Sequence, residues 1–195
     1  MDRRVILITG TPCVGKTSVA NELAKRLNAH YVNLTDLAKK HNLVVGEDKQ
    51  RRTTIINEDK MRAKLAEIIA AEDKPDTIID GHYAAAVTPK EKVTCVFVLR
   101  RNPVQLREFM VKCGFNDAKL RENLASEILD VCLVEALQEQ EAGKVCELDV
   151  TDKSVEETVE DILAVLYDRK KCRAGGIDWL GVLETQGILD DYLKI

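Results

Sequence analysis

An α/β fold with a parallel sheet is predicted by two features of the 195-residue sequence. Short apolar runs at 5–9 and 76–80 have the length and β-branched content of strands that are buried on both faces. Segments at 17–27 and 57–71 place apolar side chains at helical spacing. Strands that alternate with helices favour parallel pairing through right-handed crossovers, so we expect one domain around such a sheet.

The other elements are expected in the same alternating order. Further strands are predicted at 30–34, 94–99 and 145–150, and further helices at 36–40, 103–112, 117–140 and 155–167. Apart from its short helix, the segment 35–52 is mixed and charged. The tail 177–195 is too apolar for a disordered segment, so we expect it to pack back as a short helical hairpin or to meet a partner.

Composition narrows the class of protein. Hydrophobic residues make up 45% of the chain, and its net charge of −4 argues against a broad nucleic-acid-binding surface. No apolar run is long enough to cross a membrane, and no signal peptide is evident. The six cysteines include no C-x-x-C pair, and the three histidines are not spaced with them. We therefore expect a cytoplasmic protein with free thiols and little material for a zinc site.

A phosphate-binding loop follows the first predicted strand. Residues 10–17, Gly-Thr-Pro-Cys-Val-Gly-Lys-Thr, match the pattern G-x-x-x-x-G-K-[ST] between a strand and a helix, a context that a chance Gly-rich turn would not share. The backbone N–H groups and the helix N-terminus would cradle phosphates, with Lys16 on the β- and γ-phosphates and Thr17 on magnesium. Cys13 stands where glycine would curl more easily, which predicts a stiffer loop. The candidate residues for ATP here are Gly10, Cys13, Val14, Gly15, Lys16, Thr17 and Ser18.

An acidic residue ends the predicted strand at 76–80. A carboxylate at this edge of a parallel sheet is placed to hold magnesium together with Thr17, which makes Asp80 a candidate metal ligand. An ordinary turn aspartate is the alternative. His82, two residues later, either positions an acceptor or attacking water or is a half-buried structural histidine. We take Lys16, Asp80 and His82 as the candidate catalytic residues.

These motifs together resemble the small P-loop adenylate-kinase-like proteins of archaea and eukaryotes, a family known for coilin interaction and for small-ribosomal-subunit maturation. The resemblance covers nearly the whole chain and rests on the P-loop and on four further stretches, 33–38, 79–82, 98–127 and 176–179. It implies a three-layer nucleoside-monophosphate-kinase fold with a five-stranded parallel sheet, a short lid without zinc and a helical tail. The kinase domain would span 1–168, with an extension at 169–195 packed on it.

The resemblance also implies site residues, with ATP and Mg²⁺ as cofactors. Lys112 and Cys113 would join the ATP site, and Lys153 would contact adenine. The monophosphate-binding segment would span about 33–56 and the lid about 112–122. Monophosphate contacts are expected from Asp36, Lys39, Arg51, Arg52 and Arg100, and lid contacts from Arg121, Asn123 and Glu127. A solvated basic surface pair is an equal alternative for Arg51 and Arg52.

The implied activity is phosphoryl transfer from ATP to AMP with some ATP hydrolysis. The alternative is an ATPase-driven assembly factor with a ribosomal small-subunit protein as partner. Phe109 and Cys113 replace usual lid-side arginines and Lys39 another, which favours the alternative slightly, although Arg107, Lys112 and Arg121 are available to compensate. A kinase for shikimate or dephospho-coenzyme A ranks last, because nothing in 33–56 indicates such a pocket. No membrane partner or sequence-specific nucleic acid is expected.

Overall fold

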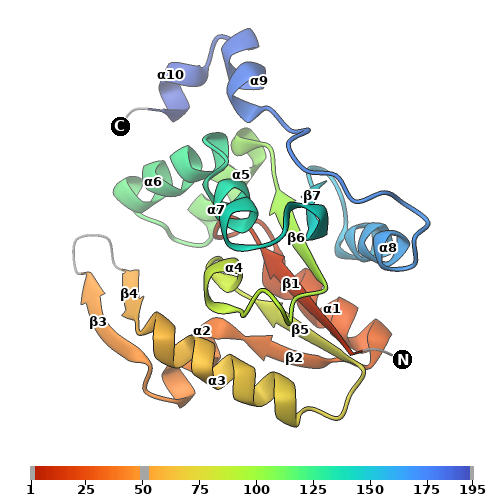
Figure 1. The fold of residues 1–195 in the computed structure, drawn as a ribbon. Coiled ribbons are helices and arrows are strands. Elements are labelled where there is room, and N and C mark those ends of the chain that lie inside the picture. The colour runs from red at the N-terminus through yellow and green to blue at the C-terminus, as the bar shows by residue number, and fades with distance from the viewer. Residues whose placement is uncertain (1–2, 49–52, 194–195) are drawn as a thin grey trace.

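The computed structural model describes residues 3–48 and 53–193 (Figure 1). Within these residues the central sheet has five parallel strands in the order β2-β5-β1-β6-β7. This arrangement confirms the predicted five-stranded parallel sheet of an α/β fold. The strands are β1 (Arg4–Thr9), β2 (His30–Asn33), β5 (Asp76–Asp80), β6 (Cys95–Arg100) and β7 (Val145–Asp149).

Helices cover both faces of the sheet, which gives three layers (Figure 1). Side chains alternate along β1, so Ile6 and Ile8 join the core under α1 and α8, whereas Val5 and Leu7 join the core under α3 and α7. All four are buried, as the apolar run at 5–9 predicts for a central parallel strand. The helices are α1 (Lys16–Leu27), α2 (Leu34–Lys40), α3 (Glu58–Ala71), α4 (Ala84–Val87), α5 (Pro103–Lys112), α6 (Asp117–Ile128), α7 (Val131–Glu139), η1 (Ala142–Lys144), α8 (Val155–Leu166), α9 (Trp179–Thr185) and α10 (Leu189–Tyr192).

A hairpin of β3 (Val44–Asp48) and β4 (Thr53–Ile56) begins in the mixed, charged segment 35–52 and ends just beyond it, and neither strand was expected. Val44, Val45 and Ile55 of these strands are exposed, so these apolar residues do not mark a buried face. The segment 49–52, between β3 and β4, lies outside the described residues. The expected monophosphate contacts of Arg51 and Arg52 fall within it.

The expected single helix over 117–140 is wrong. The chain breaks between α6 and α7 at Asp130, which has a left-handed φ of 57°. The break lets the Asp130 carboxylate and the Glu127 carbonyl both accept hydrogen bonds from the Arg100 guanidinium. A distant arginine therefore sets the helix boundary, and helical periodicity alone could not reveal it.

Two cysteines form a disulfide, so the expectation of free thiols is wrong for Cys146 and Cys172. Their Cα atoms are 4.9 Å apart. Cys172 lies on residues 169–178, which we call the strap and which links α8 to α9. The strap runs beside β7, where the Glu147 amide donates to the Arg173 carbonyl at 2.7 Å. This tertiary contact brings together cysteines that are 26 positions apart in the sequence.

The C-terminal helices lie against α6 (Figure 1). Trp179 and Leu183 of α9 are buried. The indole nitrogen of Trp179 donates to Glu127 Oε1 at 3.1 Å, so the apolar tail is fixed by a polar contact as well as by packing. Across 3–48 and 53–193, no helix combines the length and the hydropathy that a membrane crossing requires.

A buried arginine joins several of these parts. The Arg100 side chain is 1% exposed and donates to Glu127 Oε1 at 2.9 Å, and it also pairs with Asp130 and Glu147. Burial by itself lowers the pKa of Arg100, but Glu127 and Asp130 outweigh burial and raise it. Glu127 in turn accepts from the Thr11 hydroxyl at 2.5 Å. We call Thr11, Arg100, Glu127 and Glu147 the buried charge network.

Replacement of the central arginine is expected to destabilise the fold strongly. Arg100→Met leaves buried carboxylates without their cation, which should lower the free energy of unfolding by about 3–5 kcal/mol. Chemical denaturation followed by circular dichroism measures this loss.

A surface ion pair supplies the matched control. Arg26 pairs with Glu160 at an exposed position, and Arg26→Met should cost less than about 1 kcal/mol. Equal losses in the two variants would contradict the structural role assigned to Arg100.

Candidate active site

The P-loop joins β1 to α1 and depends on backbone conformations that suit glycine. Gly10 has a φ of 133°, and a Cβ there would lie 2.4 Å from the Leu99 carbonyl oxygen. Gly15 has a φ of 111° and precedes α1. Cys13 also adopts a left-handed φ, 67°, which costs a non-glycine residue about 1–2 kcal/mol. The loop therefore does take the conformation that made cysteine look unfavourable at this position.

Lys16 lies folded over the loop. Its Nζ donates to the carbonyls of Gly10 at 2.8 Å and Thr11 at 2.9 Å. Enclosure by protein atoms lowers the pKa of Lys16, although nearby groups such as Asp80 act in the opposite direction. The loop thus holds a cation above its own carbonyl oxygens, next to the amide groups at the start of α1.

Asp80 ends β5 and is 1% exposed. Its Oδ2 accepts hydrogen bonds from the Thr17 hydroxyl at 2.8 Å, the Tyr31 hydroxyl at 2.9 Å and the Asn33 amide at 2.9 Å. Burial, and then Asp80, raise the pKa of Tyr31 to about 12, so its phenol stays a donor. Sequence reasoning missed the roles of Tyr31 and Asn33. The pairing of β2 with β5, which places Asn33 opposite Asp80, is the signal that would have found them.

The donor set at this point fits magnesium. Mg²⁺ prefers oxygen ligands, and the Thr17 hydroxyl and the Asp80 carboxylate offer such atoms side by side. The two residues come from the P-loop helix and from a neighbouring strand, as the motif requires.

His82 follows a glycine that the packing requires. A Cβ at Gly81 would lie 2.7 Å from a methyl of Leu34, and the Thr9 hydroxyl holds the His82 carbonyl at 3.0 Å. His82 lines a cavity of about 230 Å³ together with Pro12, Lys119, Glu122, Asn123, Ser126, Val131, Cys132 and Glu135. The residue as a whole is exposed. Crowding by protein atoms, followed by the charges of Lys16 and Lys119, nevertheless lowers its pKa to about 4.

A second cavity lies beside the P-loop. It measures about 390 Å³ and is lined by loop residues and by Arg101, Phe109 and Lys153. The Arg101 guanidinium carbon is 4.8 Å from the centre of the Phe109 ring, and Lys153 Nζ pairs with Asp161 at 2.8 Å. Sequence reasoning did not find Arg101, because it assigned phosphate binding to the neighbouring Arg100. An arginine and a ring together offer a planar surface next to the phosphate site.

The predicted lid, 112–122, runs from the last residue of α5 through a turn into the first half of α6. Lys112 and Cys113 are exposed, and the Cys113 thiol contacts Cys13 in the P-loop. Arg121 is exposed, and Asn123 lines the cavity of His82. Glu127 does not belong to the lid, because it is 1% exposed inside the buried charge network.

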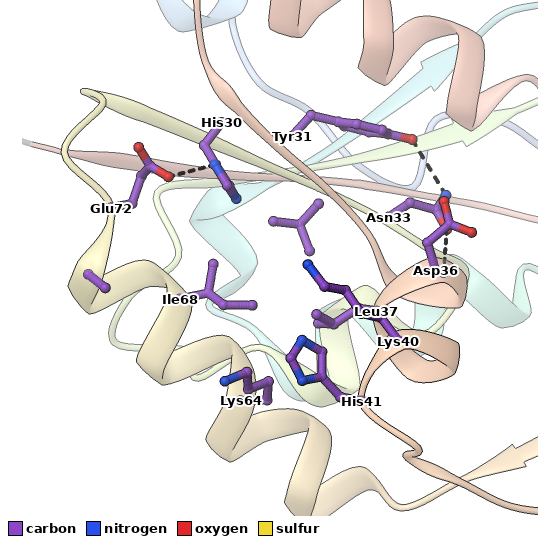
Figure 2. A pocket seen from close by; sticks show the side chains of 12 residues that line it. His30, Tyr31, Asn33, Asp36, Leu37, Lys40, His41, Lys64, Ile68 and Glu72 are labelled. Carbon is purple, nitrogen blue, oxygen red and sulfur yellow. Dashed lines mark hydrogen bonds and ion pairs between the residues drawn. The ribbon is translucent and has the colours of Figure 1, made fainter.

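The expected monophosphate residues separate in space. Arg100 is not available, because carboxylates surround its buried guanidinium. Asp36 lines a cavity of about 560 Å³ beside the edge strand β2, shown in Figure 2, and Lys39 is exposed on α2 without lining it. The figure shows Lys40, His41 and Lys64 around that cavity, whereas the Tyr31 hydroxyl and Asn33 lie together at one end of it.

Known proteins resemble this chain closely enough to place it. Residues 6–130 match a family model described as an AAA domain. A Methanocaldococcus jannaschii protein named "Putative adenylate kinase" is 37% identical over 89% of this chain and 92% of its own length. An Archaeoglobus fulgidus protein of the same name is 37% identical over 97% and 98%. Shikimate kinase from Acinetobacter baumannii matches in fold alone, with a TM-score of 0.61 and 14% identity over 86% of this chain and 95% of that one. The chain therefore belongs to the adenylate-kinase-like family of P-loop kinases.

Proposed function

We propose that the protein transfers the γ-phosphoryl group of ATP to AMP. The observation that carries the proposal is the meeting of Lys16, Thr17, Asp80 and His82 at the carboxyl ends of β1 and β5, between two cavities. Positioning and charge neutralisation supply most of the catalysis in phosphoryl transfer, and this site offers both. The name shared by the archaeal relatives supports AMP as the acceptor.

ATP would bind across the P-loop and the cavity beside it. The loop amides and Lys16 would hold the phosphates, and the base would enter between Arg101, Phe109 and Lys153. Lys112 and Cys113 stand at the edge of the same region, at the end of α5. Thr17 and Asp80 would hold Mg²⁺, which neutralises phosphate charge when bound. Tyr31 and Asn33 fix the Asp80 carboxylate for that task.

The acceptor phosphate would approach from the side of His82. The ring is neutral near pH 7, so it contributes a hydrogen bond and no positive charge. Cations for the acceptor would come from Lys39, Arg51 and Arg52, with Asp36 on the same segment. Closure of the turn at 112–122, with Arg121 and Asn123, would exclude water and favour transfer over hydrolysis.

An ATPase-driven assembly factor for small-subunit maturation is the second candidate. Phe109 and Cys113 favour it, because neither can grip phosphate as the arginines usual at these family positions would. Phe109 instead lies against Arg101, and Cys113 contacts Cys13. Poor stabilisation of phosphate by the lid would leave bound ATP open to water.

Lys16→Ala tests the first candidate. The variant lacks the ammonium that would neutralise charge on the transferring phosphate. The rate of ADP formation from ATP and AMP should therefore fall at least about 100-fold, which corresponds to about 2.7 kcal/mol in the activation barrier. A coupled assay of ADP measures the rate, and Lys25→Ala on the exposed side of the same helix is the control.

The same assay separates the two candidates. ADP formation that requires AMP and releases no free phosphate supports the kinase. Phosphate release at the same rate with and without AMP supports the ATPase. Near-full kinase activity in Lys16→Ala would refute the proposed mechanism.

His82 is expected to stay neutral down to acidic pH. Its pKa of about 4 lies below the ordinary 6.5, so the unfolded chain takes up this proton first. His82 therefore lowers the free energy of unfolding as pH falls from about 6.5 towards 4, and it has no such effect above that range. NMR titration of the imidazole, assigned with His82→Gln, should show a midpoint near 4. A midpoint near 6.5 would contradict the crowded setting described for the ring.

A further inference from the structure

Three cysteines meet at the end of the sheet opposite the P-loop. Cys95 is the first residue of β6, Cys146 is the second of β7, and Cys172 comes from the strap. The three sulfur atoms all lie within 4.8 Å of one another. Because strands of a parallel sheet begin at one edge and end at the other, this cluster is remote from the nucleotide site.

The cluster is part of the core and not of the surface. Cys95 and Cys146 are 8% and 1% exposed and face the core beneath α1 and α8. Cys172 is half-buried and closes the cluster from the solvent side. The strap is held there independently of the sulfur atoms, since Glu147 accepts hydrogen bonds from the amides of Gly176 at 2.9 Å and Ile177 at 3.3 Å.

The disulfide joins Cys146 to Cys172 and leaves Cys95 as a free thiol. Cys95 Sγ lies 3.6 Å from Cys146 Sγ, but Cys146 is paired in register with Phe97, two residues beyond Cys95. Strand spacing and rise then put the Cα atoms of Cys95 and Cys146 about 8 Å apart, beyond the roughly 7 Å that a disulfide spans. The Cys95 thiol is therefore close to the disulfide and yet poorly placed to form a disulfide with Cys146.

The spacing of the three sulfur atoms suits a metal ion bound by thiolates. Tetrahedral zinc with Zn–S bonds of about 2.3 Å places its sulfur ligands about 3.8 Å apart. The distance of 3.6 Å between Cys95 and Cys146 already matches this spacing. We propose that the reduced chain binds one thiophilic divalent cation, Zn²⁺, through Cys95, Cys146 and Cys172, with the fourth position open to solvent beside the strap.

Zinc binding and the disulfide exclude each other, because both use the sulfur atoms of Cys146 and Cys172. A phosphine reductant gives two electrons to the disulfide and becomes a phosphine oxide with the oxygen of one water. The two protons of that water pass to Cys146 and Cys172. Zn²⁺ then displaces three thiol protons and forms a complex of charge −1. Lys171 and Arg173, which flank Cys172 in the chain, supply positive charge next to it.

The test uses the full chain, reduced with a phosphine in the absence of oxygen and free of added metal. Titration with Co²⁺ alone should give thiolate-to-cobalt charge-transfer absorption that saturates at one ion per chain and disappears when Zn²⁺ is added. Cys95→Ser, which leaves Cys146 and Cys172 in place, should weaken uptake at least tenfold. Cys113→Ser, at an exposed thiol outside the cluster, should bind as the unchanged chain does.

A second measurement does not depend on how any variant folds. In the unchanged reduced chain, Zn²⁺ should protect Cys95, Cys146 and Cys172 from alkylation, read by mass spectrometry, and leave Cys113 reactive. No cobalt band in the reduced chain, undiminished uptake by a folded Cys95→Ser variant, equal uptake by the oxidised chain, or no protection of the three thiols would each overturn the proposal.

Discussion

The buried pairing of Arg100 with Glu127 is the interaction on which the rest of the structure depends. One oxygen of Glu127 binds Arg100 and Trp179 Nε1, and the other accepts from Thr11 in the P-loop. Arg100 also reaches Glu147, whose second oxygen holds the strap. A charge taken out of water is costly unless it is paired and hydrogen-bonded, so these residues must come together or the core loses stability. The phosphate loop, the central sheet and the C-terminal extension are thereby joined through one network.

A second constraint acts at the carboxyl edge of the sheet. Asp80 can be buried there only because Thr17, Tyr31 and Asn33 donate to it. The donors come from two segments, α1 and β2, and the order of β2, β5 and β1 in the sheet brings both to Asp80. The same hydrogen bonds hold the Asp80 carboxylate beside the Thr17 hydroxyl, and these two groups are the proposed magnesium ligands.

The two ends of the sheet carry different chemistry. The carboxyl edge gathers oxygen donors and cations around the P-loop, in keeping with a phosphate ligand. The amino edge gathers three sulfurs beneath the strap. Glu147 lies between the two, since it follows Cys146 in β7 and belongs to the network that reaches Thr11. The strap is therefore linked to the P-loop through the polar contacts of Glu147, Arg100 and Glu127.

The sequence by itself determined the local features whose cause is local. Apolar runs and helical repeats located most strands and helices, because burial on a sheet or a helix face leaves a periodic pattern. The P-loop was evident because its glycines and Lys16 must stand at fixed spacing to cradle phosphate. Asp80 was expected at the end of a strand, and the structure places that end beside the P-loop strand β1.

Only the tertiary structure decided features that depend on distant partners. Arg100 was expected to bind phosphate, but the structure surrounds its guanidinium with three carboxylates. Its neighbour Arg101 instead lines the cavity beside the P-loop. At the break near Asp130, the Arg100 guanidinium donates to the Asp130 carboxylate, a contact with a residue far away in the sequence. Cys95 shares no spacing motif with Cys146 and Cys172, yet strand pairing and the strap bring their sulfurs together. Charge pairing and thiol clusters form across the fold, so no window of sequence contains the information that specifies them.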